Sequence, residues 1–228
     1  MQAPDRQDSA HAAMRSRTTV RQFRPDPVPR SSIEELLELA SLAPSTFNTQ
    51  PWRVHVLAGE AKRSLSEALV AAHRANTAAP FSPFPQPPPP EFVLRQDDFG
   101  RRYYGALGID RTDMVARARQ TGRNFEFFGA PVGLIISIDG SLARHSWVDC
   151  GLFLQNLMLA AHARGLATCP QVVFARYQAL IAHELQFAPA EAVVCGMSLG
   201  FADADAKVNQ LDMPREPSAT FTRWLGFD

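Results

Sequence analysis

The segment Trp147–Ala161 limits the possible folds most strongly, because it is apolar on almost every side of a helix. At helical spacing its side chains form two opposite apolar stripes: Trp147, Cys150, Gly151, Leu154, Met158 and Ala161, and then Phe153, Leu157 and Ala160. A helix of this kind is buried inside a protein. The most apolar stretch, Gly151–Ala163, is interrupted by Gln155, Asn156 and His162 and is shorter than the roughly 20 apolar residues of a membrane span. We therefore predict a buried central helix and no membrane association.

The length and composition are those of a globular protein. The 228 residues are 46% hydrophobic and 20% charged, which excludes disordered, collagenous and fibrous classes. Lys and Arg together number 23, and so do Asp and Glu, so the chain has no overall positive field that would favour nucleic acids. We expect one domain over residues 1–228 and no nucleic-acid partner.

Strand and helix patterns alternate along the chain. Three segments have the apolar runs or the period-two alternation of strands: Arg53–Leu57, Pro131–Ile138 and Ala192–Leu199. Helical spacing appears in four others: residues 33–43, 60–75, 111–126 (weakly) and 177–187. A capping box at the start of the first of these helices is predicted from two alternative pairs: Ser31 with Glu34, or Ser32 with Glu35.

Residues 80–90 are unlike the rest of the chain, because seven of the eleven are proline. Proline removes backbone N–H donors and favours an extended conformation, so we expect a loop or arm there. Three interpretations remain open. The segment is a stiff surface insertion, a lid that carries Phe81 and Phe84 to a binding site, or a docking motif for a proline-reading domain.

The beginning of the chain and the cysteines point to a reducing compartment. Residues 1–13 are polar and carry Asp5, Arg6 and Asp8 where a signal peptide is apolar, so we expect a flexible N-terminus and a cytoplasmic protein. The three cysteines form no CxxC pair, and their odd number argues against a disulfide framework. Histidines and cysteines lack the spacing of metal ligands, so we expect no bound metal.

A serine hydrolase is one alternative, because Gly196–Gly200 matches the GxSxG pattern and follows a predicted strand. In that class the catalytic histidine follows the serine in the sequence. Here the last histidine, His183, precedes Ser198, and residues 201–205 are typical of a turn instead of a helix. Both observations disfavour a hydrolase.

Two polar clusters near the start of the chain are better candidates for a site. Arg15–Arg24 interleaves four arginines with hydroxyl groups, which suits the bidentate binding of a phosphate, although a basic surface patch has the same composition. Ala43–Trp52 follows a predicted helix and offers hydroxyl and amide groups. Amides donate and accept together, so they pair with the edge of a heterocycle, although a helix-capping loop is an equal reading.

Together and in this order, the two clusters resemble the start of the FMN-dependent nitroreductase family, which reads R-R-S-x-R-x-F and then A-P-S-S-x-N-x-Q-P-W. Arg17–Phe23 and Ala43–Trp52 fill those places. The similarity continues in four further segments: Asp149–Ala161, Gly165–Pro170, Gly196–Gly200 and Pro214–Pro217. The resemblance implies an α+β fold, a three-layer α/β/α sandwich with a mostly antiparallel central sheet. It also implies an intertwined homodimer with FMN at each subunit boundary, in which residues 202–228 form a dimerisation arm.

The resemblance assigns FMN contacts but no catalytic side chain. Arg17, Thr19 and Arg215 would hold the phosphate, and Arg21 would lie near N1 and O2 of the pyrimidine. The second cluster would surround the ring and ribityl chain through five residues: Pro44, Ser45, Thr46, Asn48 and Gln50. Backbone groups of four residues would face N5 and O4: Pro170, Gln171, Val172 and Val173. Thr18 and Thr19 stand where the family has Arg and Ser, which removes one charge from the phosphate site.

The implied reaction is the two-electron reduction of a nitroaromatic compound by NADPH or NADH. The nucleotide would give a hydride to flavin N5 and leave, and the nitro compound would then take two electrons, yielding nitroso, hydroxylamine or amine products. Arg21 would support the reduced flavin electrostatically. The alternatives are another flavin reaction on this fold, such as quinone or flavin reduction or reductive dehalogenation, and a non-catalytic FMN-binding protein.

Overall fold

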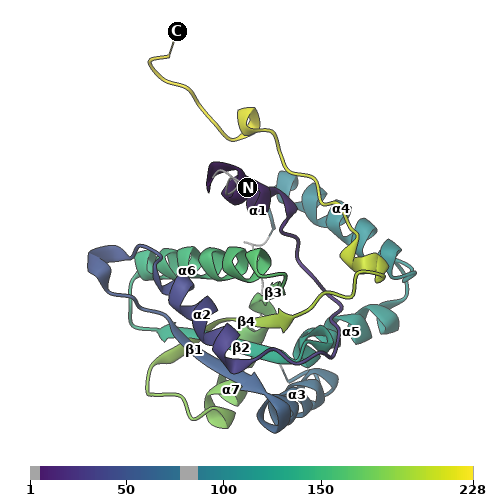
Figure 1. Cartoon of the computed structure of the whole chain (residues 1–228). Helices are drawn as coiled ribbons and strands as arrows, with labels where there is room; N and C mark the ends of the chain where they lie inside the picture. The colour runs from purple at the N-terminus through teal and green to yellow at the C-terminus, as the bar shows by residue number, and fades with distance from the viewer. Residues whose placement is uncertain (1–5, 78–86, 228) are drawn as a thin grey trace, which may run out of the picture.

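Helices cover both faces of a central sheet, in a computed structural model that describes residues 6–77 and 87–227 (Figure 1). The α-helices are α1 (Arg6–Ser16), α2 (Arg30–Ser41), α3 (Gly59–Arg74), α4 (Pro90–Ala106), α5 (Met114–Gly122), α6 (Arg144–Ala163) and α7 (Gln178–Glu184). The strands are β1 (Arg53–Ala58), β2 (Val132–Asp139), β3 (Ala167–Gln171) and β4 (Glu191–Gly200). Five 3-10 turns connect them: η1 (Thr46–Asn48), η2 (Arg123–Gly129), η3 (Val172–Tyr177), η4 (Lys207–Asn209) and η5 (Ser218–Thr220).

The four strands lie in the order β1-β2-β4-β3, and every neighbouring pair is antiparallel. An isolated parallel bridge between Thr19 and Thr168 extends the sheet beyond β3. The expected α+β class with a mostly antiparallel sheet is therefore confirmed.

Each face of the sheet has its own apolar core, because side chains alternate along the strands. Leu134 and Ile136 of β2 pack against α2 and α6, whereas Ile135 packs against α3, η2 and α7. Figure 1 shows α2 and α6 on one side of the sheet and α3 and α7 on the other. Strand β2 is buried on both faces, as its continuous apolar run predicted.

Helix α6 differs from the prediction on one side. Phe153, Leu157 and Ala161 are fully buried against the sheet, but Trp147, Val148 and Leu152 are 40–64% exposed. In a single chain the sheet and α2 cover only one side of α6. Trp147, Val148 and Leu152 therefore form an exposed apolar surface, the outer stripe of α6. Within residues 6–77 and 87–227, no helix is long and apolar enough to cross a membrane.

The capping box predicted for α2 is wrong. The N-cap residue is Pro29, two or three residues before the predicted Ser31 or Ser32, and no side chain caps the helix. Ser31 and Ser32 lie inside the first turn, where their own backbone is already helical. Instead, Arg30 Nε forms an ion pair with the Glu34 carboxylate at 2.7 Å, one turn later.

The structure differs from expectation in residues 6–13 and at Pro90, the last residue of the proline-rich segment. Residues 6–13, expected to be flexible, belong to α1. The last residue of this helix is Ser16, whose Oγ lies 2.6 Å from His162 Nε2 on α6. Phe81 and Phe84 lie outside the described residues. The proline run ends in α4, a helix that the sequence did not predict, with Pro90 in its first turn, where a missing N–H costs nothing.

The carboxylate of Glu191, at the start of β4, joins several elements at one end of the sheet. Its oxygens accept hydrogen bonds from Ser137 Oγ (2.5 Å), Arg53 Nη1 (3.3 Å) and the Ala188 N–H (3.2 Å), and lie 2.8 Å from His55 Nε2. Burial opposes the ionisation of this carboxyl, but the hydrogen bonds outweigh it and keep the pKa of Glu191 below its ordinary value.

Glu191 should therefore make the fold sensitive to acid. A carboxyl with a lowered folded pKa stabilises the protein above its unfolded pKa, about 4.3, and this stability is lost as the pH falls through the folded value. We expect Glu191→Gln to lower the free energy of unfolding at pH 7 by about 1–3 kcal/mol. Below about pH 4, the free energy of unfolding should fall less steeply in the variant than in the wild-type protein. Urea unfolding of both proteins at several pH values measures this. A free energy that falls by the same amount in both proteins on acidification would contradict it.

Candidate functional site

The arginine-rich segment after α1 runs along the edge of the sheet. Thr19 bridges to Thr168 of β3, and the Val20 N–H donates to the Thr168 carbonyl at 3.1 Å. Val20 and Phe23 are buried and fasten this segment to the core. The segment is thus held beside β3 in an extended conformation, with its arginines outside the apolar core.

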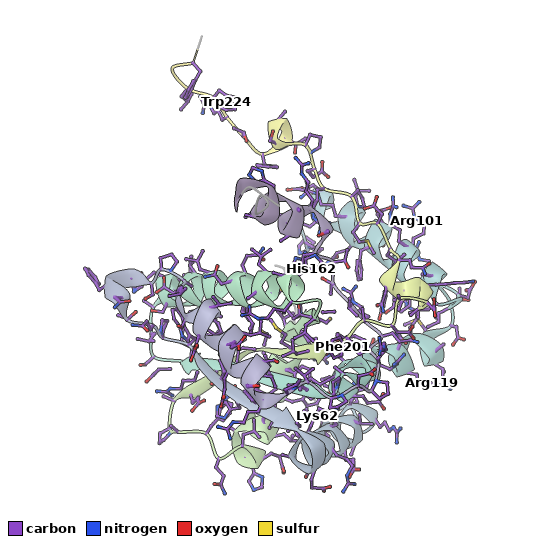
Figure 2. All side chains as sticks on the ribbon, viewed as in Figure 1. Lys62, Arg101, Arg119, His162, Phe201 and Trp224 are labelled. Atoms are coloured by element: carbon purple, nitrogen blue, oxygen red, sulfur yellow. The ribbon has the colours of Figure 1, made fainter. Side chains whose placement is uncertain are left out.

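Arg17 lines a pocket of about 230 Å³ near the end of α6, and Arg215 is close enough for its charge to act on Arg17. Arg17, Thr18 and Thr168 line it with Met158 and His162 of α6, and Figure 2 labels His162 there. Burial, and then the charge of Arg215, lower the pKa of Arg17. Among the residues that the structure describes, none accepts a hydrogen bond from the Arg17 guanidinium. Two adjacent cations without a carboxylate between them are a favourable site for an anion.

Arg21 is held by aromatic rings of α4. Its guanidinium carbon lies 5.3 Å from the centre of the Phe99 ring and 5.1 Å from that of Tyr103. Its charge lowers the pKa of Cys169 in β3, although burial has the larger effect and raises that pKa to about 11. The charge of Arg21 therefore acts on the same sheet edge as Thr19.

The predicted loop at Pro44–Gln50 has an irregular, self-bonded conformation. Ser45 Oγ accepts from the Gln50 N–H at 3.0 Å, and Gln50 Nε2 donates to Asn48 Oδ1 at 3.2 Å. Phe47, Asn48 and Gln50 have positive φ angles of 50°, 58° and 46°, which cost energy in residues other than glycine. These side chains do not bond to the end of α2, so the helix-capping interpretation is not supported. Such conformations cluster at binding sites.

Asp149 of α6 anchors this loop, a contact that the sequence analysis did not predict. Its carboxylate accepts hydrogen bonds from the Thr46 N–H at 3.1 Å and from Thr46 Oγ1 at 3.5 Å. Asp149 opens the helix segment that resembles the family, but its partner is about one hundred residues away, and no local signal links the two.

The structure does not bring the two clusters together within one chain. The loop is bonded to Asp149 near the start of α6, whereas the Arg17 pocket contains Met158 and His162 near its end. Thirteen helical residues separate Asp149 from His162, a rise of about 20 Å. Figure 1 shows the segment that follows α2 and the segment that follows α1 at opposite ends of α6.

Pro170–Val173 lies with the arginine cluster. Gln171 is buried, and its side chain is fully engaged, since Nε2 donates to the Asn124 carbonyl (2.7 Å) and Oε1 accepts from Ser198 Oγ (2.9 Å). Val172 is exposed and begins η3 at the end of β3. The side chain of Gln171 is therefore not available to a ligand, and the expected backbone contacts of this segment stay a prediction.

Other chemistries find no support in the described part of the chain. Ser198 is fully buried within β4 and bonds to Gln171, so it is not an exposed nucleophile. Burial raises the pKa of Cys150 and Cys169 to about 11 and that of Cys195 to about 12, so none is a thiolate at neutral pH. No group of three or more His, Cys, Asp or Glu side chains in this part could hold a metal ion.

The C-terminal segment leaves the body of the protein after η4, and Figure 2 shows Trp224 far from the sheet. Four large apolar side chains on it are 67–74% exposed: Phe221, Trp224, Leu225 and Phe227. An ion pair between Arg95 Nε of α4 and the Glu216 carboxylate, 3.2 Å apart, still ties the segment to the body just before these four residues. In the described part of one chain, the rings of Trp224 and Phe227 contact each other edge to face, and all four side chains remain mostly exposed.

Comparisons with known proteins identify the family of this chain and its fold. The family profile described as the nitroreductase family matches residues 14–201. The chain is 50% identical to the 4-nitrobenzoate reductase of Pseudomonas putida over 221 residues, 97% of each chain. It is 40% identical to the chloronitrobenzene nitroreductase of Comamonas testosteroni over 93% of this chain and 95% of the relative. The structure of the FMN-dependent nitroreductase NfnB from Mycobacterium smegmatis in complex with NADPH superposes with a TM-score of 0.91. That comparison covers 97% of this chain and 100% of NfnB at 35% identity.

Proposed function

This chain belongs to the nitroreductase family, and we propose that it is an FMN-dependent enzyme that passes two electrons from NADPH or NADH to a nitroaromatic compound. The observation that carries the proposal is the pair formed by Arg17, which lines the pocket, and Arg215, whose charge acts on Arg17, with no described carboxylate in an ion pair with either. The strained loop at Pro44–Gln50, fixed to α6, supplies the second half of the site.

The residues present suit FMN. The phosphate is the charged part of this cofactor, and Arg17 has donors that no described protein group uses. Thr18 and Thr19 add hydroxyl groups, and Arg215 adds the second cation. We assign the phosphate to these residues and the pyrimidine end to Arg21 and the backbone of Pro170–Val173. The ring and ribityl contacts are assigned to five loop residues: Pro44, Ser45, Thr46, Asn48 and Gln50.

Since about 20 Å of α6 separates the two clusters, we propose that the site is completed by a second copy of the chain. The loop of one subunit would then meet the arginine cluster of the other. Two exposed apolar surfaces support a homodimer: the outer stripe of α6 around Trp147 and Val148, and the arm at residues 202–227. We therefore treat residues 1–228 as one FMN-binding domain with a C-terminal dimerisation arm.

Bound FMN supplies the two-electron chemistry, and the chain supplies binding, orientation and electrostatics. Arg21 carries a positive charge that no described carboxylate pairs with, so it favours negative charge in its vicinity. No side chain is needed as a general base. The nucleotide and the nitro compound use the site in turn, in a ping-pong sequence whose products are nitroso, hydroxylamine or amine compounds. Three unpaired cysteines fit the cytoplasm, and we place the enzyme there.

The experiment that tests this function starts from the purified full-length protein. We expect a yellow protein that releases FMN on denaturation, whose colour bleaches with NADPH or NADH and returns on addition of a nitroaromatic compound. The panel should include 4-nitrobenzoate, chloronitrobenzene and a quinone. A protein that is colourless and does not take up added FMN would overturn the proposal. If only the quinone reoxidised the reduced flavin, the enzyme would catalyse a different flavin reaction on the same fold.

A further inference from the structure

The guanidinium of Arg21 is fixed without a counter-ion. Its carbon lies 5.3 Å and 5.1 Å from the ring centres of Phe99 and Tyr103. In the described part of the chain no carboxylate forms an ion pair with it. A carboxylate would cancel the charge, whereas an aromatic face attracts a cation through its quadrupole and leaves the net charge in place. The contact therefore fixes the position of Arg21 and preserves its charge.

Both rings belong to α4 and are themselves held in place. The Phe99 and Tyr103 rings stack on each other with centroids 5.4 Å apart. Tyr103 is 6% exposed, and its hydroxyl accepts a hydrogen bond from Gln120 Nε2 of α5 at 2.8 Å. Because Gln120 is also buried, the ring cannot turn away without leaving two buried polar groups unpaired.

The backbone of Arg21 is fixed by a separate contact. Its N–H donates to Asn209 Oδ1 at 2.8 Å, and Asn209 Nδ2 donates to the carbonyls of Gln22 (2.7 Å) and Asp203 (2.9 Å). With its backbone held at η4 and its guanidinium at α4, Arg21 has both ends fixed. Its charge acts on Cys169, directly before the segment Pro170–Val173.

We propose that Phe99 and Tyr103 are positioning residues, which hold the Arg21 guanidinium uncompensated beside the end of β3 so that its charge favours the reduced form of the bound flavin. This inference rests on the proposed function. It concerns α4, a part of the chain that carried no recognisable motif. Neither ring is assigned a contact with the cofactor or the substrate.

The test compares the affinity of the apoprotein for FMN with the midpoint potential of the bound flavin. Phe99→Leu and Tyr103→Leu should each lower the affinity for reduced FMN relative to oxidised FMN by about 3- to 10-fold. A tenfold change makes the potential of this two-electron couple about 30 mV more negative. Phe99 is 39% exposed, so its substitution leaves the core intact. Tyr103→Phe keeps the aromatic face and should restore most of the potential.

Two controls separate positioning from a merely structural effect. Phe92→Leu removes another ring of α4, which lies 5.8 Å from the guanidinium carbon of Arg95, and should leave the potential unchanged. In an Arg21→Gln background, Tyr103→Leu should shift the potential no further, because the charge that it positions is gone.

Three outcomes would overturn the inference. Potentials of Phe99→Leu and Tyr103→Leu equal to the wild-type value would show that the rings do not act through Arg21. A shift that persists in the Arg21→Gln background would assign the effect to structure. A wild-type protein that binds no FMN would overturn the proposed function, and the inference with it.

Discussion

Deleting residues 217–228 should convert the proposed dimer into a monomer that no longer retains FMN. The deleted arm carries four apolar side chains that are at least two-thirds exposed in one chain: Phe221, Trp224, Leu225 and Phe227. Burying such side chains is worth about 1.5–3 kcal/mol each, so one arm contributes up to about 6–12 kcal/mol to association. Light scattering coupled to size-exclusion chromatography, with the flavin absorbance recorded in the same run, measures both effects.

The position of the cut makes the result specific. Truncation after Glu216 keeps Arg215 and the ion pair between Arg95 and Glu216, so the cations assigned to the phosphate remain. Loss of flavin would therefore follow from the loss of the partner subunit and its Pro44–Gln50 loop. Trp224→Ala is a milder variant and should give a dimer that dissociates on dilution. A flavin-loaded dimer after truncation would show that α6 alone suffices for association.

The elements that the sequence predicted well are those buried on both sides or along a regular stripe. Strand β2 lies between two cores, so its apolar run was an unambiguous signal. In α4 only Tyr103 is buried, and Gly100 and Gly105 lower its helix propensity, so no periodic pattern marked this helix. Strand β3 contains Pro170, which lacks an N–H and suits an edge strand, and the sequence analysis did not predict a strand there.

In the candidate site, the sequence predicted the residue types but not their arrangement in space. The residue types at Arg17, Arg21 and Ser45 lie in short local motifs, and the sequence alone was enough to single them out. Their arrangement depends on contacts between distant segments, such as Thr46 with Asp149. The separation of the two clusters along α6 likewise follows from the fold. Spacing in the sequence carries no information about such distances. The family resemblance implied a site at a subunit boundary, and the distance between the two clusters along α6 supports the proposal that a second subunit completes it.

Arg17→Ala should weaken FMN binding by about 10- to 100-fold, because a hydrogen bond to a charged group is worth about 1.5–3 kcal/mol. Arg215→Ala should have an effect of the same order, and the double variant should lose less than the product of the two, since both cations act on one phosphate. Arg17→Lys keeps the charge but loses the forked geometry, so an intermediate loss is expected. Titration of the apoprotein with FMN, followed by flavin fluorescence, measures these affinities.

Riboflavin is the matched control, because it has the same ring and ribityl chain but no phosphate. The Arg17→Ala substitution should leave riboflavin affinity nearly unchanged, so that wild-type preference for FMN over riboflavin falls by the same 10- to 100-fold. The apoprotein should not be destabilised, since the substitution removes a like charge facing Arg215. Equal losses of affinity for FMN and riboflavin would mean that Arg17 maintains the structure of the site and does not bind the phosphate. An unchanged FMN affinity would place the phosphate elsewhere.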